Sequence, residues 1–234
     1  MDDRRDRITI TTRQPEAHDI RTDPDRRHAL RRLGLATVLP LAATAIGAGW
    51  TTRAQAQQRL MPTPRQTEGP FYPVEIPADS DHDLLVNGSR TYTPAHRTKL
   101  GGRVVDVEGK PLKGAVVEIW QCDEKGHYHH PGDGGADPNF QGFGRASVDA
   151  DGRYGFVTMR PARYSGRTPH IHVKVKLGRK ELLTTQLYVA GDPGNERDGL
   201  WRRLNADGRA ALTVPFVDGG DGWLGATFGI VVEA

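Results

Sequence analysis

Short stretches with the composition of β-strands, separated by turn residues, set the strongest limit on what this chain can fold into. From residue 100 onward, runs rich in Val, Ile, Tyr and Phe alternate with segments rich in Gly, Pro and Asp. Such runs predict strands, and a series of them predicts an all-β sandwich. The predicted strands are 102–107, 115–120, 147–149, 154–159, 170–177, 182–189, 211–216 and 226–232.

The segments between these strands show little helical pattern. A single short helix is predicted over 195–204, and tight turns are predicted at the Asp-Ala-Asp-Gly of 149–152 and the Asn-Ala-Asp-Gly of 205–208. The first turn spaces two carboxylates as a calcium loop does, but the downstream glutamate of such a loop is missing. Residues 57–66 have the composition of a linker, and 67–99 that of an irregular segment.

Two histidines and two tyrosines form the most informative set of side chains. His170 and His172 lie two apart in the predicted strand 170–177, so both imidazoles project from one face. Tyr128 and Tyr164 lie in loop-like stretches upstream. Two phenolates are hard anionic donors, so the set favours ferric iron over zinc or another divalent ion. Without further information three alternatives stay open: polar histidines on a strand face, a ligand among the histidines around Tyr128, and a surface tyrosine at Tyr164.

Five sequence strings in order resemble the intradiol ring-cleavage dioxygenases over residues 60–232. One string alone is a weak signal, whereas five in family order and approximate spacing are a strong one. They are Thr67-Glu68-Gly69-Pro70-Phe71-Tyr72-Pro73, the pair Val117-Glu118-Ile119-Trp120-Gln121 and Gly126-His127-Tyr128-His129, Arg160-Pro161-Ala162-Arg163-Tyr164, Arg167-Thr168-Pro169-His170-Ile171-His172, and Thr185-Gln186-Leu187-Tyr188-Val189-Ala190-Gly191-Asp192.

The resemblance implies a prealbumin-like β-sandwich with long irregular active-site loops and a non-haem Fe(III) centre. It implies a reaction in which O2 is used to cleave a catechol-type ring between the two hydroxyl-bearing carbons, giving a muconate-type diacid. The partners are then a small aromatic diol and O2. The implied metal ligands are Tyr128, Tyr164, His170 and His172, the implied catalytic residues are Arg167, Tyr164 and Gln186, and the implied substrate-binding residues are Gly69, Pro70, Tyr72 and Arg167.

The chain also departs from the family pattern. Ser165-Gly166 follow Tyr164, where protocatechuate-cleaving members often carry a tryptophan shortly after the second tyrosine. No residue for a substrate carboxylate is identified, and the chain has no room for the helical N-terminal dimerisation segment of catechol-cleaving members. A homo-oligomer is therefore left open, and the identity of the catechol is not predicted.

Residues 1–56 have the layout of an export signal. A polar leader precedes a mildly apolar run at 33–49, and Ala54-Gln55-Ala56 forms a small-x-small cleavage pattern. Arg26-Arg27 within the leader resembles the twin-arginine export signal, with Arg31-Arg32 as the alternative pair. We expect cleavage after Ala56 and a periplasmic or extracellular product that is not embedded in a membrane. An uncleaved anchor and a disordered leader are the alternatives.

The charge balance and the cysteine content limit what the chain can bind and how it can be cross-linked. Residues 1–56 hold ten of the 32 basic and seven of the 29 acidic residues, which leaves 22 of each in the expected mature chain. This near-neutral balance does not favour nucleic-acid binding. Cys122 is the only cysteine, so no intrachain disulfide forms, and it is predicted to be a small buried apolar residue, with Trp120 and Phe156 as core residues.

The expected organisation is a leader at 1–56, a linker and N-terminal active-site loop at 57–99, and a catalytic β-sandwich at 100–234. Two other functions compete with the dioxygenase. An exported, non-catalytic β-sandwich binding module would need no metal. A zinc or copper hydrolase or oxidase would use the histidine cluster, with Glu118 or Asp123 as base or ligand. Metal content distinguishes the three.

Overall fold

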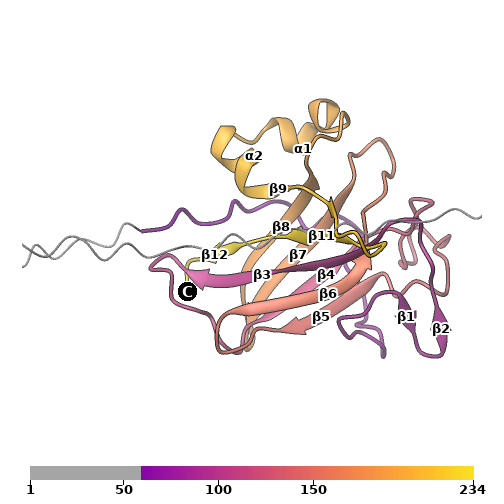
Figure 1. Ribbon diagram of the computed structural model, residues 1–234, viewed down its shortest axis with the longest axis horizontal. Coiled ribbons are helices and arrows are strands. Elements are labelled where there is room, and N and C mark those ends of the chain that lie inside the picture. The colour runs from indigo at the N-terminus through magenta and orange to yellow at the C-terminus, as the bar shows by residue number, and fades with distance from the viewer. Residues whose placement is uncertain (1–58) are drawn as a thin grey trace, which may run out of the picture. The chain divides into compact units, whose positions relative to one another are not determined.

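Two five-stranded sheets form the framework of the domain (Figure 1). The computed structural model describes residues 59–234, so the predicted leader lies outside them. One sheet has the order β5 (Phe143–Ser147), β4 (Val116–Trp120), β7 (His170–Leu177), β8 (Lys180–Val189) and β9 (Thr213–Val214). The other consists of β10 (Val217–Asp218), β11 (Leu224–Thr227), β3 (Arg97–Asp106), β12 (Ile230–Val232) and β6 (Arg153–Met159).

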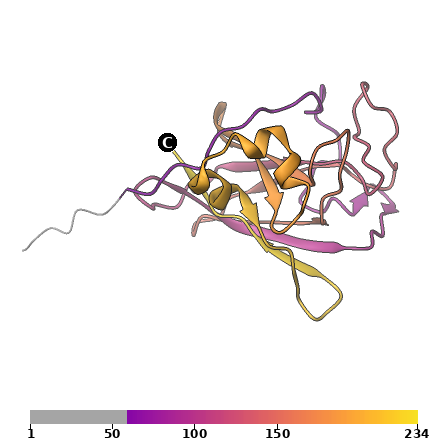
Figure 2. The same cartoon turned by 90° about the horizontal axis from the view of Figure 1, so that it is seen from above.

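Three short helical segments and a small hairpin complete the described elements. The hairpin pairs β1 (Val86–Asn87) with β2 (Arg90–Thr91). The helical segments η1 (Asn195–Arg197), α1 (Gly199–Arg202) and α2 (Ala206–Leu212) lie between β8 and β9. Figure 2 shows α1 and α2 together over one part of the domain, and the loop between β10 and β11 projecting from it. The all-β fold predicted from the sequence is confirmed.

The main core lies between the two sheets, because each contributes its apolar face to one cluster. Ile171, Val173 and Val175 of β7 enter this cluster beside Leu100 and Phe156 of the other sheet. Their burial removes apolar surface from water, which is the main favourable term in folding. Phe156 is thereby confirmed as a core residue.

Strand β7 is buried on both faces, and this places the candidate site. Its first six residues are buried, although only alternate side chains reach the main core. The other face carries His170, His172 and Lys174. The antiparallel register sets Trp120 of β4 on one side of His172 and Gln186 of β8 on the other. Loops cover this outer face, so the polar side chains are enclosed without entering the sandwich core.

Several sequence predictions differ from the structure between β8 and β9. The predicted tight turn at 205–208 is the start of α2, where the Asn205 side chain accepts a hydrogen bond from the backbone N–H of Gly208. This is N-capping, which uses the same residue types as a turn. The predicted strand 211–216 is therefore wrong at its start, and only β9 remains. The predicted helix 195–204 is divided at Asp198, which has extended backbone and caps α1.

The boundaries of other elements in the structure also differ from those predicted from the sequence. The predicted strand 147–149 lies upstream, as β5, because Asp149 accepts backbone hydrogen bonds in the following turn. The predicted strand 226–232 is divided into β11 and β12, and β3 begins at Arg97, before the start of the predicted strand 102–107. The predicted linker is bound to the sandwich, since the backbone N–H of Leu60 donates to the carbonyl of Val107 at 2.7 Å.

Cys122 is buried, as predicted for a small apolar residue. Within residues 59–234, no helix combines the length and the apolar character that a membrane span requires.

Gly102 of β3 faces the backbone of Phe228, between β11 and β12. A Cβ atom at this position would lie 1.9 Å from the Phe228 carbonyl oxygen. We expect Gly102→Ala to lower the free energy of unfolding by about 2 kcal/mol or more, because backbone must move to relieve the overlap. Urea unfolding followed by circular dichroism measures this change.

Gly155→Ala is the matched control for this prediction. Gly155 lies on the neighbouring strand β6, where the nearest atom to a built Cβ is 3.9 Å away. An unfolding midpoint for Gly102→Ala equal to that of Gly155→Ala would contradict the packing argument.

Candidate active site

The four predicted metal ligands lie together on the outer face of the sheet that contains β7. His170 and His172 come from β7, Tyr128 from the loop after β4, and Tyr164 from the loop after β6. The ring centroids are 4.7 Å apart for the two histidines and 5.0 Å for the two tyrosines. They are 5.5 Å apart for Tyr164 and His170, and 6.0 Å for Tyr128 and His172. Residues distant in sequence thus form one cluster.

The two histidines are buried in their neutral form. Nδ1 of His170 lies 2.7 Å from the Thr168 carbonyl oxygen, so it carries the proton and donates it, which leaves a lone pair on Nε2. That Nε2 lies 3.2 Å from Nε2 of His172. Burial lowers the pKa of His170 to about 4 and the pKa of His172 well below its usual value. Both imidazoles are therefore uncharged near neutral pH, as metal binding requires.

The tyrosines need a nearby cation to ionise. The Tyr128 hydroxyl is buried with no hydrogen-bond partner in the described part of the chain. Burial raises the pKa of Tyr128 well above its usual value. Burial also raises the pKa of Tyr164, although the Arg167 guanidinium opposes that shift. An ion with high positive charge between the two phenol oxygens would offset the cost of burying them as phenolates.

The histidines beside Tyr128 are engaged elsewhere. His127 Nδ1 lies 3.0 Å from a carboxylate oxygen of Asp133, and His129 Nε2 lies 2.5 Å from the Phe140 carbonyl oxygen. His130 Nδ1 accepts a hydrogen bond from a backbone N–H. The donor set near His170 is therefore two phenols and two imidazoles, which fits a hard trivalent ion such as ferric iron.

A tight turn brings Tyr164 and Arg167 together. The backbone N–H of Arg167 donates to the Tyr164 carbonyl at 2.7 Å, and the two residues form a β-bridge. Between them Ser165 has φ of 42° and Gly166 has φ of 74°. Positive φ at both central residues is the hallmark of a type I′ turn, which places flanking side chains next to each other. The Arg167 guanidinium consequently lies beside the Tyr164 phenol.

Two side chains fix the Arg167 guanidinium: the carboxylate of Asp198 and the amide of Gln186. Its Nε donates to Asp198 at 2.6 Å, and its Nη2 donates to Oε1 of Gln186 at 2.7 Å. Gln186 in turn donates from Nε2 to the Thr67 carbonyl at 3.0 Å. Asp198 also accepts from the backbone N–H groups of Thr168 and Leu200. Asp198 was not predicted as a site residue, because only the fold brings the start of α1 beside the Arg167 turn.

Comparisons with known proteins agree with this geometry. A family model described as "Dioxygenase" matches residues 67–202, which include every predicted site residue. The protocatechuate 3,4-dioxygenase beta chain of Burkholderia cepacia is 33% identical over 198 residues, covering 79% of this chain and 75% of the relative. The chain belongs to the intradiol ring-cleavage dioxygenase family.

Other relatives extend the comparison. Catechol 1,2-dioxygenase of Acinetobacter baylyi is 34% identical over 149 residues, covering 56% of this chain and 47% of the relative. The chain thus matches about half the length of that relative. Among solved structures, the dioxygenase domain of a dioxygenase carbohydrate-binding protein fusion from Streptomyces sp. SirexAA-E is 34% identical with a TM-score of 0.58. The match covers 74% of this chain and 99% of that domain.

The N-terminal loop of this intradiol dioxygenase lies against the histidines. A Cβ built on Gly69 would be 3.2 Å from Cε1 of His172, so the loop backbone contacts the ring directly. Phe71 stacks on Tyr128 with ring centroids 4.5 Å apart. Pro70 is exposed. Phe71, which was not among the predicted substrate-binding residues, therefore packs against both tyrosines.

Tyr72 packs against Trp120 and is fixed by Glu118 and Lys174. Its hydroxyl donates to Glu118 at 2.8 Å, and the Lys174 ammonium lies 3.8 Å from its ring centroid. Its edge packs on Trp120, which stacks on His172 with centroids 4.8 Å apart and planes 8° apart. Trp120 is buried as predicted, but it belongs to a smaller cluster beside the site and not to the sandwich core.

Glu118 or Asp123 would have to serve as base or ligand in a zinc or copper hydrolase or oxidase, and both carboxylates have other partners. Glu118 is fully buried and, besides Tyr72, pairs with Arg145 and Lys176 at 3.3 Å each. Asp123 accepts backbone hydrogen bonds that shape the Tyr128 loop. In the described part of the chain, no group of three or more His, Cys, Asp or Glu side chains is arranged to hold a metal. The geometry therefore favours the tyrosine–histidine set over a carboxylate-based centre.

The Ser165-Gly166 turn generates a prediction. At Gly166 a valine would adopt an unfavourable left-handed conformation, at a cost of about 1–2 kcal/mol, and the turn would distort. Misplacing Tyr164 and Arg167 should then lower kcat roughly tenfold or more. Turnover of a catechol by the iron-loaded protein, together with thermal unfolding, measures both effects.

Gly178→Val is the matched control for the turn. Gly178 has φ of 58° and lies in the turn between β7 and β8, and no atom lies within 4 Å of a built Cβ at either glycine. Both variants should lose similar stability, while only Gly166→Val loses turnover. Equal kcat in the two variants would show that the turn does not position the site.

Proposed function

We propose that this intradiol dioxygenase holds Fe(III) through Tyr128, Tyr164, His170 and His172. With O2, it would then cleave a catechol-type aromatic diol between its two hydroxyl-bearing carbons to a muconate-type diacid. The observation that carries the proposal is the convergence of these four side chains, with a lone pair on His170 Nε2 and a buried, unpartnered Tyr128 hydroxyl. When bound, the iron would supply a Lewis acid and electron sink for the ring.

The two tyrosines have different roles in the proposal. Tyr128 is 2% exposed and is anchored by a hydrogen bond from its backbone N–H to Asp133 at 2.7 Å. Tyr164 is partly exposed and lies on a two-residue turn. The more accessible Tyr164 is the better candidate to accept a proton at its phenol oxygen from a substrate hydroxyl. Tyr128 would remain in place throughout.

Arg167 supplies positive charge where the substrate ring becomes electron-rich. Its side chain is 20% exposed and is paired with the fully buried carboxylate of Asp198. A fixed guanidinium of this kind stabilises developing negative charge without reorganising. Gln186 acts as a positioning residue, because its amide oxygen accepts from Arg167 while its amide nitrogen donates to the Thr67 carbonyl in the N-terminal loop.

Family membership decides for an enzyme over the non-catalytic binding module. The substrate is proposed only as a catechol-type diol: relatives are named for catechol, protocatechuate and hydroxyquinol. Since one chain supplies all four proposed ligands, the site needs no residue from a second copy in a homo-oligomer. Export to the periplasm or the extracellular space remains our proposal from the Arg26-Arg27 pair and the Ala54-Gln55-Ala56 pattern.

The ligand assignment predicts a coloured protein. Iron-loaded enzyme should show a broad tyrosinate-to-iron charge-transfer band that shifts when a catechol is added without oxygen. Tyr164→Phe should alter the band. His172→Ala should reduce bound iron. Both should reduce turnover by more than the roughly 10–100-fold typical of losing an outer partner of a ligand. Visible absorption and iron analysis measure these effects.

Tyr92→Phe is the control for the coloured centre, because Tyr92 lies outside the ligand cluster beside Glu124. Its spectrum and iron content should match those of the unaltered protein. A colourless protein that takes up negligible iron on reconstitution would refute the assignment.

The proposed role of Arg167 predicts that replacing it lowers turnover and leaves the metal bound. Arg167→Gln should lower kcat roughly 100–1000-fold, as expected when a group stabilising developing charge is removed. The visible band should remain, because Arg167 is not a proposed ligand. Steady-state oxygen uptake with a catechol, alongside the spectrum, tests this.

Arg179→Gln is the control for charge alone, since Arg179 is exposed in the turn between β7 and β8. It should retain kcat. An Arg167→Gln enzyme with normal kcat would remove Arg167 from the mechanism.

A further inference from the structure

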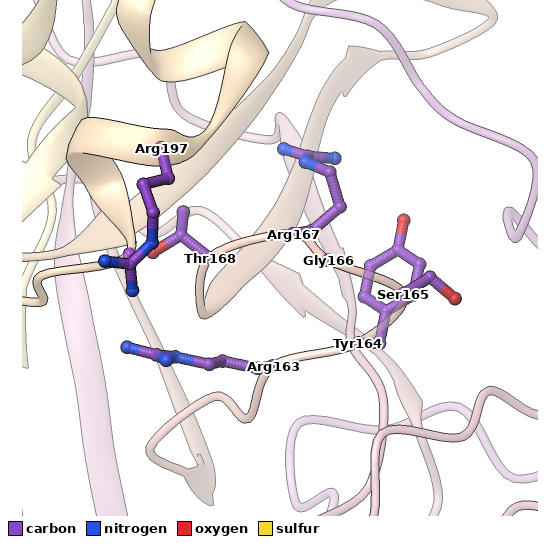
Figure 3. A pocket seen from close by; sticks show the side chains of 8 residues that line it. Arg163, Tyr164, Ser165, Gly166, Arg167, Thr168 and Arg197 are labelled. Carbon is purple, nitrogen blue, oxygen red and sulfur yellow. The ribbon is translucent and has the colours of Figure 1, made fainter.

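A cleft lined by arginines lies beside Tyr164 (Figure 3). It has a volume of about 310 Å³. Arg163, Tyr164 and Arg167 come from the loop between β6 and β7, and Arg197 comes from η1 on the opposite wall. In Figure 3 the side chains of Arg163 and Arg197 extend to the same side of Thr168, while the Tyr164 ring lies on the other side.

The arginines of this cleft differ in whether an acidic side chain neutralises their charge. Arg167 is paired with Asp198. Arg163 donates to Asp192 at 2.6 Å, and Asp192 also lies 3.7 Å from Arg160. Among residues 59–234, no hydrogen bond or ion pair involves the Arg197 side chain. Positive charge therefore exceeds negative charge at this end of the cleft, which favours an anionic ligand.

The cleft and the proposed ligand cluster share Tyr164. The residues following it, Ser165 and Gly166, carry little side-chain bulk, and no atom lies within 4 Å of a Cβ built on Gly166. The cleft thus runs from Tyr164 along this turn to Arg197, and a substituent on a ring bound at the cluster would enter it there. A planar guanidinium binds a carboxylate through paired hydrogen bonds, so a carboxylate fits a cleft lined by two arginines.

We propose that this cleft binds a carboxylate on a short side chain of the catechol substrate, with Arg197 as the main partner and Arg163 as the second. The inference rests on the proposed function and narrows its substrate class to anionic, side-chain-bearing catechols. The sequence does not reveal this pair, because Arg163 and Arg197 are separated by the whole of β7 and β8.

A matched pair of substrates isolates the charge. We would compare kcat/KM of the iron-loaded full chain for a catechol with a propanoate side chain and for its primary amide. Their shape is similar, but only the acid is anionic. The acid should be preferred by roughly tenfold or more, the value expected for one charge-assisted hydrogen bond. The preference should fall as salt is added, because Arg163 and Arg197 are both exposed to solvent.

Variants identify the arginine. In Arg197→Gln the preference for the acid should fall toward equality while kcat/KM for the amide is retained. Arg197→Glu should reverse the preference. Arg203→Gln is the matched control, because Arg203 is exposed at the end of α1 and does not line the cleft. Arg197 has no partner to lose in these residues, so its replacement should not disturb folding.

The outcomes are distinguishable. A preference that disappears in Arg197→Gln and persists in Arg203→Gln supports the inference. Equal efficiency for acid and amide in the unaltered enzyme, or an unchanged preference in Arg197→Gln, overturns the inference and leaves the proposed function standing. Failure to cleave either compound or plain catechol, with iron bound, overturns the proposed function and the inference with it.

Discussion

The alternation of side chains along β7 is the constraint on which the site depends. Ile171 and Val173 anchor the strand in the sandwich core, so His170 and His172 necessarily face the other way. A shift of one residue in register would exchange the two sets and expose the apolar side chains. The apolar core thus determines the direction of the histidines. Tyr128 and Tyr164, the other two proposed ligands, are brought to that face by the loops after β4 and β6.

A second layer of polar contacts holds those loops in place. The Arg167 guanidinium links the β6–β7 turn to Asp198 at the start of α1 and to Gln186 on β8. Gln186 extends the link to Thr67 in the N-terminal loop. On the other side, Glu118 and Lys174 hold Tyr72 against Trp120. Buried polar groups of this kind are costly unless every partner is present, so the network specifies one loop arrangement.

Sequence patterns predicted much of this arrangement for clear reasons. Strands with apolar neighbours, such as β4, β7 and β8, were located because burial leaves a periodic signal. The segment after β8 was misjudged, because Asn205 is equally suited to a turn and to a helix N-cap. Asp198 was missed as the partner of Arg167, since a carboxylate in a loop carries no sequence mark of the residue that it will contact.

The sequence by itself determined the strand content of the fold, the shared face of His170 and His172, and the family to which the chain belongs. Periodicity and ordered motifs are local properties, and they survive without knowledge of contacts. Only the tertiary structure decided that Phe71 stacks on Tyr128, that Trp120 supports His172 rather than the main core, and that Arg197 stands across a cleft from Arg163. Those pairings depend on how loops fold back over one face of a sheet, and no local pattern encodes that path.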